Sequence, residues 1–294
     1  MNAEAVSPDT VLLTLRFLRF GAAMLLWGSG VYLTAITPAT LATRLRSRLA
    51  SPCATATAVL VAVTAVRLPL LAASFGNGWP DATSPEVLVA VLQTRTGLAW
   101  IFDAVLCLLL VTTRSIACGQ PVAATALSGL LLAGSAITGH ALIGIGGWGV
   151  AHQLNDAVHL LAAGFWLGAL PALALTLRHE GAGPEAVRTV ARFAVAGQAA
   201  VALVVATGVA NALLITGGTP LLWSSVYDVL LVLKLTVVLT MIGIASINHF
   251  RLLLRLVAGS NNAAQALRLG ALFELGLGVI AVGLVTVFGM MDAG

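Results

Sequence analysis

The segment HQLNDAVHLLAAGFWLGALPALALTL, residues His152 to Leu177, determines the fold class of this chain. Its 26 residues include one acid, Asp156, and no lysine or arginine. About twenty apolar residues are enough for a helix to cross the roughly 30 Å hydrocarbon core of a bilayer. We therefore predict a transmembrane helix over residues 152–177.

Segments of similar composition recur along the whole chain of 294 residues, which is 59% hydrophobic and 9% charged with a mean hydropathy of +1.01. Soluble domains carry about a quarter charged residues. Because backbone polar groups in lipid must be paired within the segment, the sequence predicts an all-α membrane helix bundle in contact with the lipid bilayer. The expected helices, about eight in number, lie near residues 11–36, 54–76, 97–113, 122–140, 152–177, 190–216, 223–247 and 270–291.

No loop between these predicted helices is long enough for a folded domain outside the membrane. We therefore expect a single integral-membrane domain over residues 1–294. The sequence does not indicate an oligomeric state.

The arginines in the loops favour one side of the membrane by nine to one. Loops rich in Lys and Arg stay in the cytoplasm, so both termini are predicted to lie outside. Because the arginines are placed by membrane orientation, we interpret the net charge of +4 as a sign of that orientation. It gives no reason to expect a nucleic-acid partner. The nine are Arg44, Arg46, Arg48, Arg114, Arg178, Arg188, Arg251, Arg255 and Arg268, and the one is Arg95.

Two histidines and a carboxylate share one face of the predicted helix 152–177. At about 100° per residue, His152 and His159 lie about 20° apart, and Asp156 lies about 40° from the first and 60° from the second. His140 ends the preceding predicted helix and can return to this face across the turn GIGGWG. Three of the five histidines thus converge on one side of the bundle.

An ionisable residue within a membrane span costs about 2.5–3.5 kcal/mol on insertion scales, so it marks a functional site by default. Clustered imidazoles suit Cu, Zn, Fe or Ni, and a nearby carboxylate can orient an imidazole. The predicted metal ligands are His140, His152 and His159, with Asp156, Asn155 and Trp166 as the residues that support them.

Other polar residues within the predicted helices have structural explanations. Arg67 and Asp103 fall at similar depth and are expected to form an ion pair. Lys234, the only lysine, lies near the middle of a predicted helix and needs a partner, for which the candidates are Asn211, Asp228 and Glu274.

The remaining candidate residues are expected to serve packing or to face solvent. Gly164 and Gly168 form a G-x-x-x-G pattern that favours close helix packing. His179, in the segment RHEGAGPE, is expected to be exposed. The cysteines contain no C-x-x-C pair, so no disulfide framework or thiolate metal site is predicted from Cys53, Cys107 and Cys118.

Five segments, taken in order, resemble the copper resistance protein D family of bacterial inner-membrane proteins, over residues from about 92 to 254. They are LQTRTGLAWIFDAVL, SAITGHA, HLLAAGFWLGALPAL, VARFAVAGQAAVALVVATGVANALL and VYDVLLVLKLTVVLTMIGIASINHFRL. The resemblance implies copper handling at the cytoplasmic membrane, often beside a periplasmic copper-binding partner. The residues carried over by the match are His140, His159, Trp166, Arg192, Asn211, Tyr227 and Lys234.

Two departures from the family pattern concern the path of the metal. The family usually has arginine after the asparagine that closes the span near 223–247, whereas here His249 follows Asn248. His249 is therefore a candidate for the place where copper leaves. The chain also lacks methionine-rich runs, so the oxidation state of the copper, Cu(I) or Cu(II), stays open.

Three functions agree with these observations. The first is a non-enzymatic copper transporter or acquisition protein with an outward-facing histidine site that contributes to copper homeostasis or resistance. The second is an electron-transfer protein with b-type haem and a quinone partner, in which His140 and His159 supply opposed axial imidazoles. The third is a membrane subunit that presents copper to a partner without transporting it.

Overall fold

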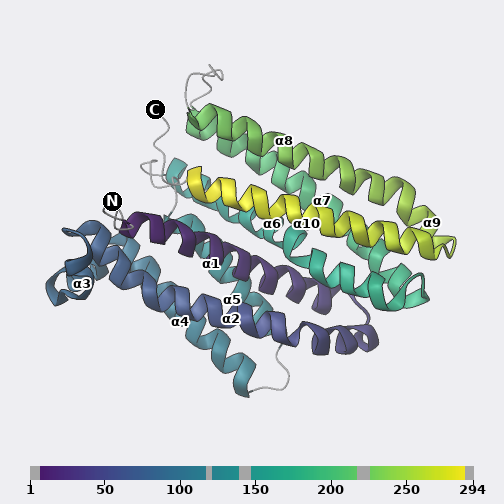
Figure 1. Ribbon diagram of the computed structural model, residues 1–294, viewed down its shortest axis with the longest axis horizontal. Helices are drawn as coiled ribbons and strands as arrows, with labels where there is room; N and C mark the ends of the chain where they lie inside the picture. Colours follow the sequence, from purple (N-terminus) through teal and green to yellow (C-terminus); the bar gives the residue numbers. More distant parts are fainter. Residues whose placement is uncertain (1–6, 117–120, 139–146, 217–225, 289–294) are drawn as a thin grey trace, which may run out of the picture.

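The computed structural model describes residues 7–116, 121–138, 147–216 and 226–288, which form a bundle of roughly aligned helices (Figure 1). No β-strand occurs within these ranges. In chain order the α-helices are α1 (Pro8–Val31), α2 (Ala39–Phe75), α3 (Pro85–Leu92), α4 (Arg95–Ile116), α5 (Pro121–Ala133), α6 (Gly147–Glu180), α7 (Pro184–Thr216), α8 (Val226–Ile247), α9 (Leu253–Val257) and α10 (Asn261–Phe288). Short π- or 3₁₀-helices follow or link them: η1 (Tyr32–Ile36), η2 (Trp79–Thr83), η3 (Gly134–Thr138) and η5 (Asn248–Leu252).

Seven helical segments in the described chain are long and apolar enough to cross a membrane. The helix α5 is shorter, but at rises of about 1.5 Å and 2.0 Å per residue, α5 and η3 together extend about 30 Å. The start of α1 and the end of α10 lie at the same end of the bundle (Figure 1), which requires an even number of crossings. The predicted all-α membrane helix bundle is confirmed, with seven helices of spanning length in the described chain and α5 with η3 at the place of the eighth predicted helix.

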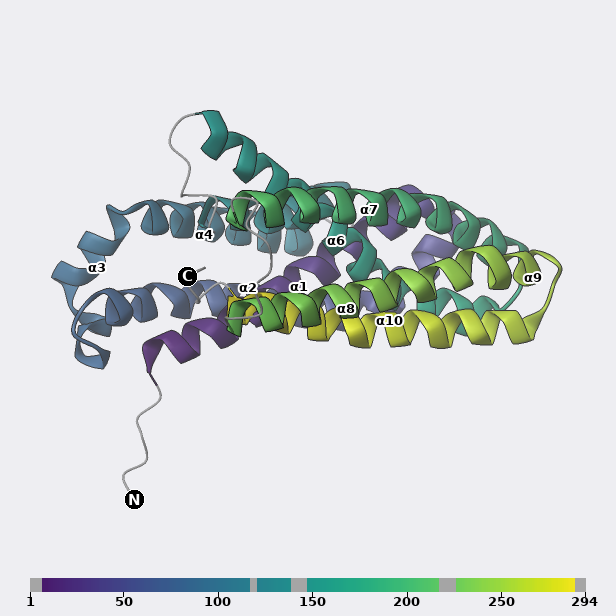
Figure 2. The same cartoon turned by 90° about the horizontal axis from the view of Figure 1, so that it is seen from above.

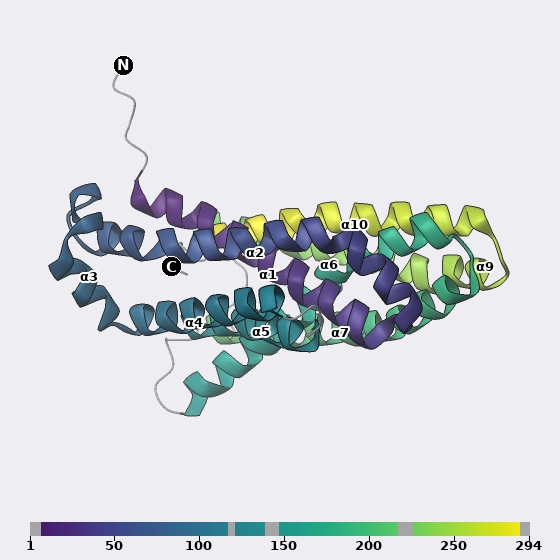
Figure 3. The same cartoon turned by 90° about the horizontal axis from the view of Figure 1, so that it is seen from below.

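The helix α6 is the centre of the bundle. In its most apolar stretch 72% of the residues are buried, compared with 11% in the corresponding stretch of α8. It packs against α1, α5, α7 and α10. On one side of the bundle α8 and α10 run side by side (Figure 2), and on another α4 packs against α2 and α5 (Figure 3). Polar residues on α6 are therefore held between other helices.

The largest difference from the predicted helices concerns α2, which begins at Ala39 and not near residue 54. Leu41, Leu45 and Leu49, spaced at helical intervals, are 0–2% exposed, while the arginines between them face outward. An amphipathic end of this kind lowers the mean hydropathy of the segment, although it forms a stable helix. The arginine-rich segment that was expected to be a turn is therefore an extension of the helix.

Capping residues explain two further differences. The helix α3 was not predicted; the Ser84 hydroxyl caps it by accepting from the Val87 backbone N–H at 3.4 Å, and Pro85 occupies its first turn. The helix α10 begins at Asn261, where the prediction began near residue 270. There the Ser260 hydroxyl accepts from the Ala263 backbone N–H at 3.3 Å.

Glycines bring α1 and α6 into backbone contact. A Cβ added at Gly168 would lie 1.7 Å from the carbonyl oxygen of Met24, and one added at Gly28 would lie 2.6 Å from the carbonyl oxygen of Gly164. The predicted close packing at Gly164 and Gly168 is confirmed, with α1 as the partner helix. The Ser29 hydroxyl adds a hydrogen bond to the Gly168 carbonyl at 2.8 Å.

One continuous cluster of buried apolar residues runs from Phe20 in α1 to Ala271 in α10. It contains side chains of α2, α4, α5, α6 and α7 as well. Because these helices share a core, we infer that the chain folds as a single domain.

Candidate functional site

The polar face predicted on α6 meets α7 near the end of the bundle opposite the arginine-rich turns. The Asn155 side-chain amide donates to the Thr207 backbone carbonyl at 3.0 Å and to the Asn211 side-chain oxygen at 2.7 Å. The Asn211 amide in turn donates to the Asp156 carboxylate at 3.2 Å. Two neighbouring residues of α6 are thus tied to α7 through one asparagine.

The ring of His159 is oriented by the hydroxyl of Thr207. Its Nδ1 lies 2.9 Å from that hydroxyl oxygen. The Thr207 hydroxyl has one hydrogen, which it donates to the backbone carbonyl of Leu203 at 2.5 Å. The hydroxyl therefore accepts from His159, whose proton must be on Nδ1, and the lone pair of a neutral ring is on Nε2. This is the tautomer in which a histidine can bind a metal through Nε2.

Asp156 and His159 have separate hydrogen-bond partners on α7. The carboxylate of Asp156 accepts from Asn211, whereas the imidazole of His159 is held by Thr207. The permanent positive charges near enough to act on Asp156 are those of Lys234 in α8 and Arg16 in α1. The orienting contact to His159 therefore comes from Thr207 of α7, and a charge-balancing role for Asp156 stays a prediction.

Among the described residues, the carboxylate near enough to act on Lys234 is that of Asp156, which was not among the predicted candidates. The carboxylate of Glu274, a predicted candidate, accepts hydrogen bonds from Trp166 and Asn248. The side chains of Asp228 and Tyr227 lie outside the part of the chain whose side chains are described.

No three histidine, cysteine, aspartate or glutamate side chains within the described ranges gather closely enough to surround a metal ion. His140, the third predicted ligand, lies outside those ranges. His152 and His159 are both half-buried on α6. The three-histidine site therefore stays a prediction.

The expected ion pair between Arg67 and Asp103 is present, and the sequence reading missed its third member. Arg67 donates to one carboxylate oxygen of Asp103 at 3.1 Å, and Arg19 of α1 donates to the other at 2.7 Å. Arg19 also bonds the Leu131 carbonyl at 3.0 Å and the Ser135 hydroxyl. The cluster joins α1, α2, α4 and α5 with its η3 extension.

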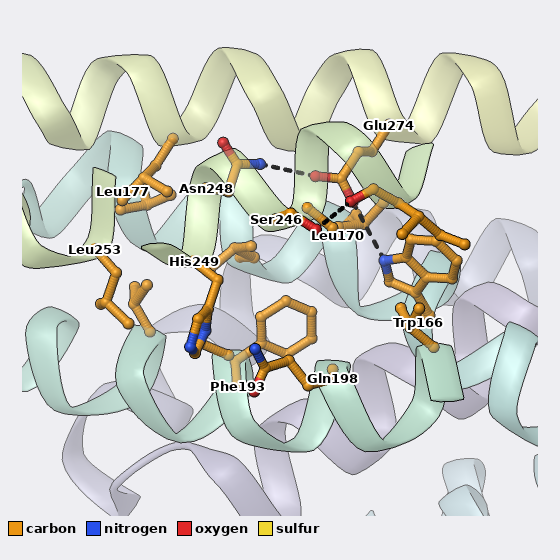
Figure 4. A pocket seen from close by; sticks show the side chains of 18 of the residues that line it. Trp166, Leu170, Leu177, Phe193, Gln198, Ser246, Asn248, His249, Leu253 and Glu274 are labelled. Carbon is orange, nitrogen blue, oxygen red and sulfur yellow. Dashed lines mark hydrogen bonds between the residues drawn. The ribbon is translucent and has the colours of Figure 1, made fainter. Parts of the chain in front are cut away.

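The indole of Trp166 is hydrogen-bonded to α10. Its N–H donates to the Glu274 carboxylate of α10 at 3.2 Å, and the Asn248 amide donates to the other oxygen at 2.7 Å. These groups line a cavity of about 290 Å³ between α6, α7, α8 with η5, and α10 (Figure 4). His249 lines the same cavity. Glu274 was not predicted as part of the site, because no residue near it in the sequence indicates such a role.

The remaining predicted residues lie apart from the polar face of α6 and from the cavity beside Glu274. His179 is exposed, as expected. Arg192 reaches the Ile36 carbonyl at 3.5 Å. Cys53 and Cys107 are free thiols, and Cys118 lies outside the described residues.

Two family models match the chain. The model described as "Copper resistance protein D-like, N-terminal domain" matches residues 7–150, and "Copper resistance protein D" matches residues 187–288. The part of α6 with His152 and His159 lies between the two matched ranges.

Three named proteins are similar over much of the chain. The "Inner membrane protein YebZ" of Escherichia coli is 32% identical over 290 residues, which cover 95% of this chain and 97% of that protein. The "Copper resistance protein D" of Pseudomonas syringae pv. tomato is 32% identical, with 80% of each chain covered. The "Copper transport protein CutJ" of Bacillus subtilis is 30% identical over 61% of this chain and 35% of its own length. No solved structure matches. From these matches and the membrane-length helices, the chain is a multi-pass inner-membrane protein that belongs to the copper resistance protein D family.

Proposed function

We propose that this protein carries copper across the bacterial cytoplasmic membrane, or acquires it there, through a histidine site on the outward end of α6. Family membership supports a copper-related role. The proposed ligands are His152 and His159, together with His140. In this role the protein catalyses no covalent reaction, and copper is its cargo.

The observation that carries the proposal is the hydrogen bond between His159 and Thr207. With the proton on Nδ1, the lone pair of the neutral imidazole is on Nε2, where it could bind a metal. Histidines that bind metals commonly donate their other ring N–H to a neighbouring oxygen, which holds the ring in position. Because the bundle has few charged groups, we propose that a histidine ring held in this way is a metal ligand and not a packing residue.

Charge balance supports the same site. Copper entering this face meets the positive charges of Lys234 and Arg16, which both act on Asp156. The Asp156 carboxylate offsets them close to the histidines, and Asn211 holds it against α7. We propose that Asp156 lowers the electrostatic cost of placing a copper ion beside His152 and His159.

The haem alternative gains no support from the packing of His159. A haem with two axial imidazoles needs them on facing helices, and the helix that faces His159 is α7, which contains no histidine. A purified haem protein would show a Soret absorption band, so an optical spectrum separates the two functions directly.

Copper binding and uptake test the proposal. Purified protein is assayed for bound copper and then reconstituted into proteoliposomes for uptake of isotopic copper. His159→Ala should lose most of the binding and uptake, whereas the exposed control His179→Ala should retain both. Wild-type protein that binds no copper would refute the proposal. Binding without uptake would show that the protein presents copper to a partner, such as a periplasmic copper-binding protein.

A further inference from the structure

We propose that a second cavity, lined by α1, α2 and α5, binds an anionic phospholipid whose phosphate lies between Arg46 and Arg114. The cavity has a volume of about 230 Å³ and lies at the arginine-rich end of the bundle. It shares no lining residue with the cavity beside Glu274. The inference is therefore independent of the proposed copper function.

The packing of four helices leaves room for this cavity. Both α2 and α5 pack against α1 and against α4, and the cavity lies between them. One stripe of α2, at helical intervals from Arg46 to Cys53, faces the space. Small residues widen the cavity, because their side chains do not reach across it. They are Ser29, Gly30, Ala50, Ala124 and Ser128.

The hydroxyl groups of the lining are already satisfied within the protein. Each donates to a backbone carbonyl at 2.6–2.8 Å, and a hydroxyl has only one hydrogen to donate. They belong to Ser29, Thr34, Thr125 and Ser128. The strong donors that remain for a ligand are the guanidinium groups of Arg46 and Arg114, which accept no hydrogen bond. Such a pair selects a ligand rich in acceptors and negative charge.

The two arginines have no carboxylate to balance them. Glu180 and Glu185, the acids beside the arginine-rich turns, both pair with Arg44, at 3.3 and 2.9 Å. No ion pair to Arg46 or Arg114 forms among the described residues. Both side chains are exposed, so they lie at the mouth of the cavity. A guanidinium group matches the geometry of phosphate oxygens, so a phosphate between the two would neutralise both.

The depth and apolar lining of the cavity favour a lipid over a soluble anion. Arg114 lies in the last turn of α4 and Pro121 begins α5, so the arginines lie where these helices reach the headgroups. From Leu33 the lining continues to Leu26, about two helical turns deeper, and it includes Leu49 of α2. An acyl chain would fill this part, which an inorganic phosphate would leave empty.

The predicted orientation supports the same ligand. The arginine distribution predicts that this end of the bundle faces the cytoplasm. Basic pockets between membrane helices on that side bind anionic lipid headgroups. A lipid held there would also bridge α2 and α5.

The test titrates full-length protein in detergent with phosphatidylglycerol and measures the bound lipid by native mass spectrometry. Wild-type protein should bind it at least about tenfold more tightly than zwitterionic phosphatidylcholine. Arg46→Gln and Arg114→Gln should each weaken the binding about fivefold, the contribution of one basic residue near anionic lipid. Arg46→Lys keeps the charge and should keep most of the affinity. The matched control Arg48→Gln, on the same helix but outside the lining, should leave binding unchanged.

A second pair of variants tests the apolar part of the cavity. Ala124→Leu fills the space and should weaken phosphatidylglycerol binding, whereas Ala126→Leu, exposed on the same helix and outside the lining, should not. Thermal unfolding without lipid establishes that each variant folds, and the exposed arginine positions carry the test if Ala124→Leu does not.

Three results would overturn the lipid site. The first is equal affinity for phosphatidylglycerol in wild type and in the double variant of Arg46→Gln with Arg114→Gln. The second is equal affinity of wild-type protein for phosphatidylglycerol and phosphatidylcholine. The third is an unfolding midpoint raised as much by inorganic phosphate as by phosphatidylglycerol, which would assign the arginines to a free anion. None of these results would affect the proposed copper site at His159.

Discussion

The hydroxyl of Thr207 in α7 lies 2.9 Å from Nδ1 of His159 in α6, and its own hydrogen is directed to the Leu203 carbonyl. One threonine thereby sets both the tautomer and the orientation of a histidine on the neighbouring helix. The contact also depends on how α6 and α7 pack, because it joins residues 48 positions apart in sequence.

Replacing Thr207 by valine should weaken copper binding while leaving the fold intact. Valine has nearly the same shape but accepts no hydrogen bond, so the ring of His159 loses its fixed tautomer. Loss of such a supporting contact typically costs about 10–100-fold in metal affinity. Titration of copper into purified protein measures the change.

Two further variants control this experiment. Thr207→Ser keeps the hydroxyl and should restore most of the affinity. Thr240→Val removes a hydroxyl that bonds only within α8, to the Thr236 carbonyl, and should have no effect. Equal affinity in Thr207→Val and wild type would show that His159 does not bind copper through a fixed Nε2.

Gly168→Ala should destabilise the protein through the contact between α1 and α6. The added Cβ would lie 1.7 Å from the Met24 carbonyl oxygen, and a backbone atom in a helix has little freedom to move away. Overpacking of this kind costs about 1–3 kcal/mol. Thermal unfolding in detergent should show a lower midpoint than wild type.

Gly243→Ala is the matched control, because nothing lies within 4 Å of a Cβ added there. In a helix interior alanine is favoured over glycine by about 1 kcal/mol, so this variant should be as stable as wild type or more so. A midpoint for Gly168→Ala equal to that of Gly243→Ala would contradict the close helix contact.

Asp103→Asn should destabilise the protein without changing copper binding by the folded fraction. The change leaves two arginines without their carboxylate in a cluster where the Asp103 side chain is 5% exposed. Breaking a buried ion pair by removing one partner costs about 3–5 kcal/mol. Thermal unfolding and copper stoichiometry are measured on the same preparation.

Glu86→Gln, at an exposed residue, should leave the stability unchanged. If Asp103→Asn lost as much bound copper as His159→Ala, the cluster of Arg19, Arg67 and Asp103 would instead lie in the copper pathway.

Much of the fold could be predicted from the sequence, because apolar length sets membrane helices almost without tertiary information. The helix α6 is the clearest case, since its apolar run and its polar stripe are both local patterns. The amphipathic start of α2 was not predicted, because arginines alternate there with the buried Leu41, Leu45 and Leu49. Only the neighbouring helices make that face a core face.

The partners of the site were harder to predict, because they depend on packing between helices. Thr207 begins the TGVAN end of a segment that resembles the family, but that pattern does not indicate that its hydroxyl supports His159. Arg19 was missed at Asp103 for the same reason, since Arg67 already gave that carboxylate a partner. Glu274 was considered only as a partner for Lys234, and its bonds to Trp166 and Asn248 join three helical segments.

The arginine distribution predicts the orientation of the bundle, which can be tested with cysteines at its two ends. In a background without Cys53, Cys107 and Cys118, Glu86→Cys should react with a membrane-impermeant thiol reagent added outside intact cells. Asn262→Cys, at the arginine-rich end, should react only after the membrane is opened. Both residues are exposed. The reverse pattern would place the histidine face of α6 in the cytoplasm.

His140, His152 and His159 should behave as one copper site. The latter two lie about 20° apart on α6, and His140 is joined to that helix by a short turn in the sequence. If the three share one ion, each His→Ala change should remove most of the binding. The double changes should add little more, because the same ion is lost each time and coupled residues are not additive.

Protons should compete with copper at this site, because an imidazole must be neutral to coordinate a metal. Copper stoichiometry should therefore fall as the medium is acidified. The measurement is copper stoichiometry as a function of pH for wild type, the three single variants and His179→Ala as control. Full stoichiometry in the triple alanine variant would eliminate the site. A Soret band that disappears in His140→Ala or His159→Ala would assign these histidines to haem.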